Sequence, residues 1–349
     1  MNNSNSIHIN ILKQFYRFVF VISFLGLFLF VFDYGYNQSS DVQIFLNASY
    51  FLIIVLGILS SVLRYRLKKQ IIKRNVLVFD ITSILISFIV LYIHFFSEEA
   101  HRHLTFLYND NWVKFAIILT FIREFSEQNI NFKRAVLNPA QLFIVSFLVI
   151  IFIGSLLLML PNATHQGLSF IDALFTSTSA VCVTGLIVVD TGSYFTIFGQ
   201  AIILMLIQIG GLGILTFASY FSYFFKGGST YENQLTLSDV TGSNKLGEVF
   251  STLKRILVIT FSIELVAALL IYLSIKGTLF KTFGDQLFFS VFHSISAFCN
   301  AGFSTLQNGL YETGFKFNYV LQLILIILLI LGGLGFPILV NIMKYSKQN

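Results

Sequence analysis

The chain has 349 residues, of which 56% are hydrophobic and 11% are charged, and its mean hydropathy is +0.81. Globular proteins carry about 25% charged residues, so this composition excludes a soluble protein. A formal charge of +6 would suggest a nucleic-acid partner in a soluble protein, but basic cytoplasmic loops explain it here, and we expect no nucleic acid. The sequence shows no paired nucleophile and base, metal-ligand cluster or phosphate-binding loop, so we expect neither an enzyme nor a covalently bound cofactor.

Apolar segments of about 20 residues, the length that crosses a bilayer, recur along the chain. Two shorter and more polar segments, at 168–184 and 285–301, are too brief to span, and we predict that they re-enter the membrane from its outer face. The sequence thus predicts an all-α membrane protein with about eight transmembrane helices and two re-entrant pore helices. The predicted spans are 14–32, 42–63, 76–96, 104–122, 140–160, 196–225, 253–275 and 317–343.

Basic residues predict the orientation of these spans, because loops rich in lysine and arginine stay in the cytoplasm. The connection between the second and third spans is the most basic, and we place it inside. Alternation from there puts both termini and most lysine and arginine residues in the cytoplasm. We therefore expect a multi-pass protein of the plasma (inner) membrane, embedded in the lipid bilayer. The basic connection contains Arg64, Arg66, Lys68, Lys69, Lys73 and Arg74.

Two stretches, TSTSAVCVTGL at 176–186 and HSISAFCNAGF at 293–303, are versions of one another. Each lies between two apolar segments, so the chain after residue 135 contains two units of outer helix, pore helix and inner helix. We predict an N-terminal extension of about four transmembrane helices at 1–135, a first repeat at 136–226, a cytoplasmic loop at 227–251 and a second repeat at 252–349. The matched residues are Phe175/Phe292, Ser177/Ser294, Ser179/Ser296, Ala180/Ala297, Cys182/Cys299 and Gly185/Gly302.

After each pore helix the chain is predicted to return in extended form, through 183–186 and 300–303. Backbone carbonyls in such a segment can replace the water that a cation loses. Glycine, at Gly185 and Gly302, lets the backbone turn its carbonyls toward an axis without a side chain in the way. The pore helix also directs the negative end of its dipole at the same place, which favours a cation.

These residues resemble a known family. TSTSAVCVTGLIVVDTGSYF followed by IQIGGLGILTF (207–217) resembles the first pore repeat of the Trk/Ktr/HKT superfamily of potassium transporters, and SAFCNAGFS (296–304) followed by LGGLGFP (331–337) resembles the second. The resemblance implies glycine-centred filter strands and potassium as the transported ion, held by the carbonyls of Val183, Thr184, Asn300 and Ala301. Glycine in both filters favours K⁺ over Na⁺. The implied filter segments are Cys182, Val183, Thr184, Gly185 and Leu186, and Cys299, Asn300, Ala301, Gly302 and Phe303.

Members of that family build one pore from four repeats, whereas this chain has two. We expect the N-terminal half of a longer pore subunit. The alternatives are a two-repeat chain that pairs with a second copy and a non-conducting membrane scaffold. The resemblance further implies a homodimer, and a cytosolic nucleotide-binding regulatory subunit that would dock on the polar loop at 226–251.

Several other residues leave two interpretations open. The inner-helix glycines favour close helix packing, with a gating hinge as the alternative. Glu264, in the middle of a predicted span, could anchor a filter loop, or bind a cation or a proton. His293 on the second pore helix could make a hydrogen bond behind the filter or sense pH. The glycines are Gly210, Gly211, Gly213, Gly332, Gly333 and Gly335.

Overall fold

The computed structural model describes residues 2–67, 74–96, 110–126, 139–226, 245–275, 279–280, 282–335 and 338–339. The chain divides into two compact units, Met1–Ala135 and Val136–Asn349. Throughout the described residues the regular structure is helical, and the β pairing there is limited to an isolated bridge between Thr164 and Phe195. The predicted all-α fold is thereby confirmed for this part of the chain.

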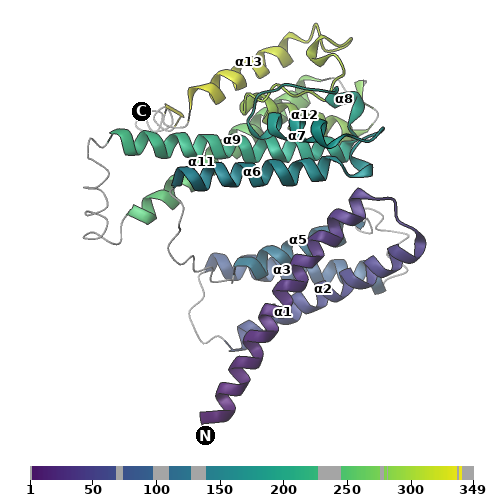
Figure 1. Ribbon diagram of the computed structural model, residues 1–349, viewed down its shortest axis with the longest axis vertical. Helices are drawn as coiled ribbons and strands as arrows, with labels where there is room; N and C mark the ends of the chain where they lie inside the picture. The colour runs from purple at the N-terminus through teal and green to yellow at the C-terminus, as the bar shows by residue number, and fades with distance from the viewer. Residues whose placement is uncertain are drawn as a thin grey trace. The chain divides into compact units, whose positions relative to one another are not determined.

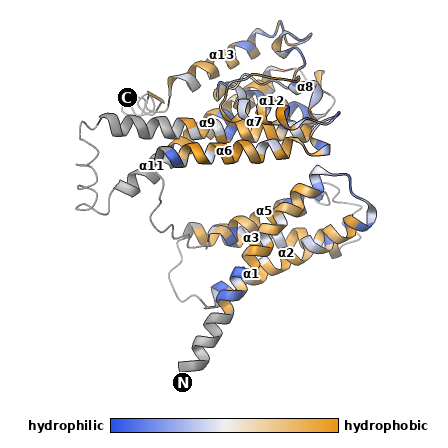
Figure 2. Cartoon of the chain, viewed as in Figure 1, coloured by the Kyte–Doolittle hydropathy of each residue, from blue (hydrophilic) through white to orange (hydrophobic). Residues whose placement is uncertain are grey.

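Five of the described helices are long and apolar enough to cross a membrane: Leu12–Gly35, Ser40–Tyr65, Val76–Phe95, Ile197–Ile214 and Lys254–Ser274. Three shorter apolar helices are Phe143–Leu158, Phe170–Val181 and Tyr319–Leu334. In Figure 2 the visible faces of the labelled helices are mostly hydrophobic, as expected where lipid replaces water. The chain is therefore a multi-pass membrane protein.

The N-terminal unit contains four described helices: α1 (Asn2–Gly35), α2 (Ser40–Leu67), α3 (Arg74–Phe96) and α5 (Asp110–Ser126). Helix α5 packs against the other three, as Figure 1 shows. Its core joins Tyr50 and Ile54 of α2 to Ile117 of α5. The span predicted at 104–122 corresponds to α5, which begins at Asp110; residues 97–109 lie outside the described part.

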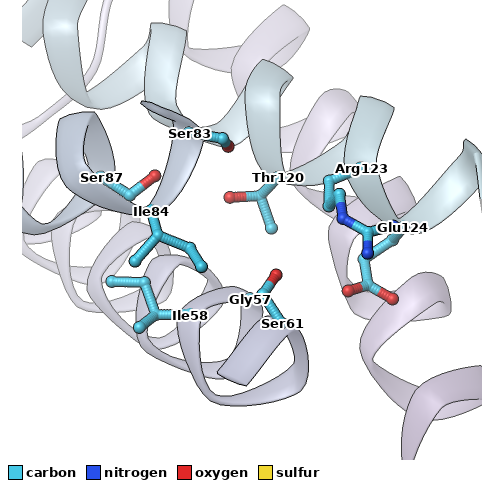
Figure 3. Close-up of a pocket in the computed structure, with 9 residues that line it drawn as sticks. All are labelled: Gly57, Ile58, Ser61, Ser83, Ile84, Ser87, Thr120, Arg123 and Glu124. Atoms are coloured by element: carbon cyan, nitrogen blue, oxygen red, sulfur yellow. The ribbon is translucent and has the colours of Figure 1, made fainter. Parts of the chain in front are cut away.

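One end of this unit buries two ion pairs. Arg64 pairs with Glu124, and Arg123 Nε lies 2.5 Å from Asp80 Oδ1. Asp80 also accepts a hydrogen bond from the hydroxyl of Tyr65. Buried charges inside a membrane protein require such partners. Beside these pairs lies a polar cavity of about 10 Å³, close to the space that one water needs. Figure 3 shows its lining: Gly57, Ile58, Ser61, Ser83, Ile84, Ser87, Thr120, Arg123 and Glu124.

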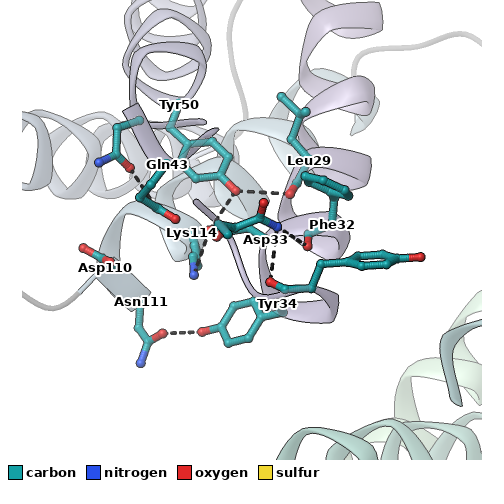
Figure 4. Close-up of polar contacts among 12 residues, drawn as sticks. Leu29, Phe32, Asp33, Tyr34, Gln43, Tyr50, Asp110, Asn111 and Lys114 are labelled. Atoms are coloured by element: carbon teal, nitrogen blue, oxygen red, sulfur yellow. Dashed lines mark hydrogen bonds and ion pairs between the residues drawn. The ribbon is translucent and has the colours of Figure 1, made fainter. Parts of the chain in front are cut away.

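The other end of the unit holds a second polar cluster around Asp33 (Figure 4). Its carboxylate lies 2.8 Å from Lys114 Nζ and accepts a hydrogen bond of 3.1 Å from the hydroxyl of Tyr50. Lys114 also lies over the ring of Tyr34, 4.0 Å from its centre. Because α5 carries Lys114 near its start and Arg123 near its end, ion pairs secure this helix at both ends.

The second unit begins with the first repeat. Helix α6 (Pro139–Leu158) is followed by a 3₁₀ turn, η1 (Pro161–Ala163), and the short helix α7 (Phe170–Val181). A connection with one more turn of helix, α8 (Thr191–Tyr194), leads to the long helix α9 (Ile197–Lys226). Helix α7 packs between α6 and α9. A short helix enclosed by two long ones is the arrangement expected of a re-entrant segment, whose exposed ends need protein around them.

The second repeat has the same order of elements. Helix α11 (Lys245–Ser274) precedes the short helix α12 (Phe283–Phe298), which is followed by η3 (Gly309–Tyr311) and α13 (Tyr319–Leu334). Helix α12 packs between α11 and α13. The two repeats are joined by α9, which contacts both α11 and α12 (Figure 1). This contact brings the C-terminal ends of the two short helices to one place.

Candidate ion pathway

The two short helices begin with the same cap. The side chain of Ser169 accepts a hydrogen bond of 3.2 Å from the amide of Asp172, and that of Thr282 accepts one of 3.1 Å from the amide of Asp285. Each cap satisfies an amide that has no partner within the helix, and the acidic residue complements the positive end of the dipole. The negative ends of α7 and α12 then lie at Cys182 and Cys299.

A matched serine ties each short helix to its outer helix. Ser177 Oγ donates to the carbonyl of Ile151 in α6 at 2.8 Å, and Ser294 Oγ donates to the carbonyl of Glu264 in α11 at 2.7 Å. All four residues are at least largely buried, and both serines are fully enclosed. The repeated serine of the sequence therefore makes the same contact in both repeats.

A matched glycine seats the end of each short helix on its inner helix. A side chain at Gly210 would overlap the carbonyl oxygen of Val181, and one at Gly332 would overlap that of Phe298. Each carbonyl belongs to the last turn of its short helix. Only glycine lets the inner helix approach this closely, so these two positions support the packing interpretation.

The remaining inner-helix glycines differ from one another. Gly211 faces the sulfur of Cys299, in the next repeat, and Gly213 faces the ring of Phe147. Gly333, the counterpart of Gly211, meets no described atom within 4 Å of where its Cβ would lie. Gly335 ends α13 with φ of 77°, a left-handed conformation in which the helix cannot continue. The hinge interpretation stays a prediction for these glycines.

The return segments depart from the extended form that the sequence suggested. Val183 and Asn300 have φ of 57° and 60°, and among the described residues they are the non-glycine positions with positive φ. Two residues later Gly185 and Gly302 have φ of 77° and 73°. Both segments therefore repeat one unusual backbone conformation, with left-handed residues at matched positions.

The amides and the carbonyls of the return segments differ in their hydrogen bonds. The amides of Val183 and Thr184 donate to the last turn of α7 at 3.2 and 2.9 Å, and those of Asn300 and Ala301 donate to α12 at 3.0 and 2.7 Å. In the described part of the chain, the carbonyl oxygens of these four residues accept no hydrogen bond. The amides are thus satisfied by protein, while the carbonyls remain available to another partner.

The two return segments meet at their glycines. A Cβ on Gly185 would lie 2.5 Å from the carbonyl oxygen of Ala301 and 3.3 Å from the Cα of Gly302. A Cβ on Gly302 would lie 3.5 Å from the Cα of Gly185. The segments are therefore in van der Waals contact, with the Ala301 carbonyl oxygen beside Gly185, and no side chain could be added at Gly185 without displacing backbone.

Side chains brace each segment, but in different ways. Thr184 Oγ1 donates to Ser179 Oγ at 3.0 Å in the first repeat. In the second, Ser296 Oγ donates to the carbonyl of Phe303 at 2.7 Å, so this carbonyl has a protein partner. His293 links α12 to the residue that follows the second segment: its Nδ1 lies 2.9 Å from the Phe289 carbonyl and its Nε2 lies 2.9 Å from Ser304 Oγ. That geometry matches the hydrogen-bonding interpretation of His293.

The side chain of Asn300 points away from its neighbour segment and toward α13. With its amide oriented to satisfy both atoms, it donates to the Leu329 carbonyl and accepts from the Gly333 amide, each at 3.2 Å. Asn300 thus anchors the second segment to its inner helix. Leu186 of the first segment is 62% exposed and makes no comparable anchor.

The sequence did not predict one contact near the return segments, between Gln208 and Glu264. Gln208 of α9 directs its amide nitrogen at both carboxylate oxygens of Glu264 in α11, at 3.1 Å each. Gln208 is a polar residue inside an otherwise apolar helix, and this could have marked it as a residue with a buried partner. The sequence does not show, however, that the partner is Glu264. The loop proposed as a docking surface, at 226–251, lies outside the residues whose side chains the structure describes.

The described residues define a class of protein: a helical, multi-pass membrane protein in which a unit of outer helix, short helix and inner helix occurs twice. A family model described as "TrkH: Cation transport protein" matches residues 110–348, which include α5 and both repeats. The chain belongs to this family of cation transport proteins, within the Trk/Ktr superfamily of potassium transporters. Residues before 110 lie outside the match.

Curated relatives agree. The chain is 42% identical over 210 residues to the Ktr system potassium uptake protein B of Bacillus subtilis, covering 60% of this chain and 46% of the relative. It is 35% identical over 215 residues to the potassium/sodium uptake protein NtpJ of Enterococcus hirae, with the same coverage. It is 34% identical over 208 residues to the Ktr system potassium uptake protein B of Vibrio alginolyticus, covering 60% and 45%. The chain spans about half the length of the curated relatives it matches.

Proposed function

We propose that this chain supplies two of the filter segments of a potassium pathway across the plasma membrane. The ion would be held by the main-chain carbonyls of Val183, Thr184, Asn300 and Ala301, which replace part of its hydration shell. The observation that carries this proposal is the shared backbone conformation of the two segments, whose amides bond to the short helices and whose carbonyls accept no described hydrogen bond.

The names of the relatives favour potassium as the ion. Two are named potassium uptake proteins, and one is named a potassium/sodium uptake protein. Glycine at both Gly185 and Gly302 supports the same choice, because both segments can then approach the axis through bare backbone. The dipoles of α7 and α12, with their negative ends at the segments, add a field that favours a cation of either kind.

Completion of the pathway needs further filter segments, and we place them in additional repeats of the same protein. The relatives are about twice as long as the matched region. No described atom lies beside Gly333, at the position that corresponds to the one Cys299 fills beside Gly211. A third repeat would bring its own short helix to Gly333. The alternative is that two copies of this chain pair to complete one pore. We also propose that complete pores form a homodimer and bind a cytosolic nucleotide-binding subunit.

The test is potassium uptake by a cell that lacks its own uptake systems and expresses the full reading frame. We expect wild type to restore growth at low potassium and Gly185→Ser to abolish it, because the new side chain meets the Ala301 carbonyl in a left-handed backbone position. The matched control is Gly167→Ala. Gly167 also has a positive φ, of 81°, but no described atom lies within 4 Å of its Cβ position.

Equal growth of wild type and Gly185→Ser at low potassium would contradict the filter assignment. Sodium uptake measured in the same cells shows whether the substitution alters ion preference rather than transport itself. Two further filter motifs in the reading frame beyond Asn349 would support the additional repeats. Cross-linking of two copies through their filter segments would support the paired alternative instead.

A further inference from the structure

Glu264 is a buried carboxyl group that the proposed potassium pathway does not use. It lies in the membrane-spanning part of α11, at Lys254–Ser274, and is 5% exposed. Both carboxylate oxygens accept a hydrogen bond from the amide nitrogen of Gln208 in α9, at 3.1 Å each. The contact joins the outer helix of the second repeat to the inner helix of the first.

No described cation balances this carboxyl group. Helix α9 carries no titratable side chain in its described part, 197–214, and α13 carries only Tyr319, at its start. On α12, Asp285 lies in the first turn, and both ring nitrogens of His293 have other partners. On α11 itself, Lys254 and Arg255 are exposed and about 14 Å along the helix from Glu264, taking 1.5 Å per residue. The remaining group within electrostatic reach is the thiol of Cys299.

The hydrogen bonds of Gln208 indicate which form of Glu264 this site accommodates. The carbonyl oxygen of the Gln208 side chain is buried and has no hydrogen-bond partner among the residues that the structure describes. A carboxylate can only accept hydrogen bonds, so it leaves that oxygen unsatisfied. A carboxylic acid also has an O–H, which can donate to the amide oxygen while its own carbonyl accepts from the amide nitrogen. One proton therefore satisfies both side chains, after a rotation of the Gln208 amide.

We infer that Glu264 and Gln208 form a proton-binding site in the membrane. A proton from the solvent adds to a carboxylate oxygen of Glu264, and the product is the neutral acid paired reciprocally with the amide. Removing the proton restores the negative charge and leaves the amide oxygen of Gln208 without a donor. The two states therefore differ in the hydrogen bonds between α9 and α11.

This site is connected to both filter segments. The main-chain carbonyl of Glu264 accepts the hydrogen bond from Ser294 of α12. Gln208 stands two and three residues before Gly210 and Gly211, which contact Val181 and Cys299 at the ends of the two short helices. A change in the Gln208–Glu264 contact therefore acts on the helices that position both segments. This coupling to ion flux rests on the proposed potassium pathway, whereas proton binding at Glu264 does not.

Infrared spectroscopy tests the proton site independently of transport. Protein purified from the full reading frame and placed in lipid nanodiscs should show the C=O stretch of a buried carboxylic acid that shifts in D₂O. This band should be missing in Glu264→Gln. The control Glu124→Gln changes the other fully buried glutamate of a described helix and should leave the band in place. A spectrum of Glu264→Gln that retains the band would overturn the assignment.

Potassium flux as a function of pH tests the coupling. We expect wild-type flux to change between mildly acidic and mildly alkaline pH and Glu264→Gln to lose this dependence, since glutamine mimics the neutral acid. Glu264→Asp should shift the midpoint, which keeps the test decisive if Glu264→Gln folds poorly. Glu124→Gln, the control in the infrared experiment, should retain the wild-type profile, because Glu124 lies in the N-terminal unit and pairs there with Arg64. An unchanged profile in both Glu264 variants would refute the coupling, even if the infrared band is present.

Discussion

Gly210 and Gly332 make the same contact in the two repeats: each brings the Cα of an inner helix against the carbonyl oxygen in the last turn of its own short helix. Since each proposed filter segment follows directly from its short helix, this contact links helix packing to the proposed pathway. Substitution with alanine should force the two helices apart. Overpacking of this kind costs about 1–3 kcal/mol per site.

We therefore expect Gly210→Ala and Gly332→Ala each to lower the thermal stability of the purified protein and to reduce potassium uptake. The control is Gly284→Ala, in the first turn of α12, where the nearest described atom to a new Cβ is Thr282 Oγ1 at 3.7 Å. If all three variants behave alike, the packing argument fails.

Ser296→Ala should loosen the second filter segment. It removes the hydrogen bond that holds the Phe303 carbonyl, which contributes about 1 kcal/mol and orients the backbone after Gly302. We expect uptake to continue with lower preference for potassium over sodium, measured as the ratio of the two fluxes. Ser290→Ala is the matched control, because Ser290 is equally buried in α12 but bonds within its helix, to the Gln286 carbonyl. The proposed role of the Ser296–Phe303 hydrogen bond would be contradicted if Ser290→Ala lost selectivity, or if Ser296→Ala kept it.

Gly333→Ala tests whether a further short helix packs beside Gly333. If a further short helix packs beside Gly333 as Cys299 packs beside Gly211, alanine should impair uptake in the full protein about as much as Gly211→Ala does. Growth at low potassium measures both variants. Full activity of Gly333→Ala, together with loss of activity in Gly211→Ala, would show that nothing fills this position.

The ion pair between Arg123 and Asp80 is expected to stabilise the N-terminal unit only as a pair. Asp80→Asn or Arg123→Gln leaves one buried charge without its partner, which costs about 3–5 kcal/mol. The double variant should be less destabilised than the sum of the two single variants, because it removes both charges. Thermal unfolding in nanodiscs measures all three. Strict additivity of the two single effects would mean that the side chains do not interact.

Five of the eight predicted spans correspond to described helices long and apolar enough to cross a membrane, and the sequence could locate them because an apolar run of sufficient length is a direct physical requirement of the bilayer. The sequence also located the short helices, although these proved to be 170–181 and 283–298 rather than 168–184 and 285–301. Matched pairs such as Ser177 and Ser294 marked contacts that occur in both repeats. Internal repetition therefore carried information that a single apolar segment lacks.

Other features could not be read from the sequence. Nothing in a run such as Val183-Thr184-Gly185 indicates a left-handed valine, since β-branched residues avoid that conformation and are held there only by the surrounding structure. The pairing of Gln208 with Glu264 depends on how two helices are rotated about their axes. Helices that are apolar on most sides give little directional signal for that rotation.

Val183 and Asn300 have nearly equal positive φ angles, but the energetic cost differs between the two residues. Asparagine tolerates the left-handed region, whereas a β-branched side chain there stores about 1–3 kcal/mol of conformational energy. The backbone of the first return segment is therefore strained, whereas that of the second is not. On warming, or when the surrounding helices move apart, the segment at Val183 should be the first to leave this conformation.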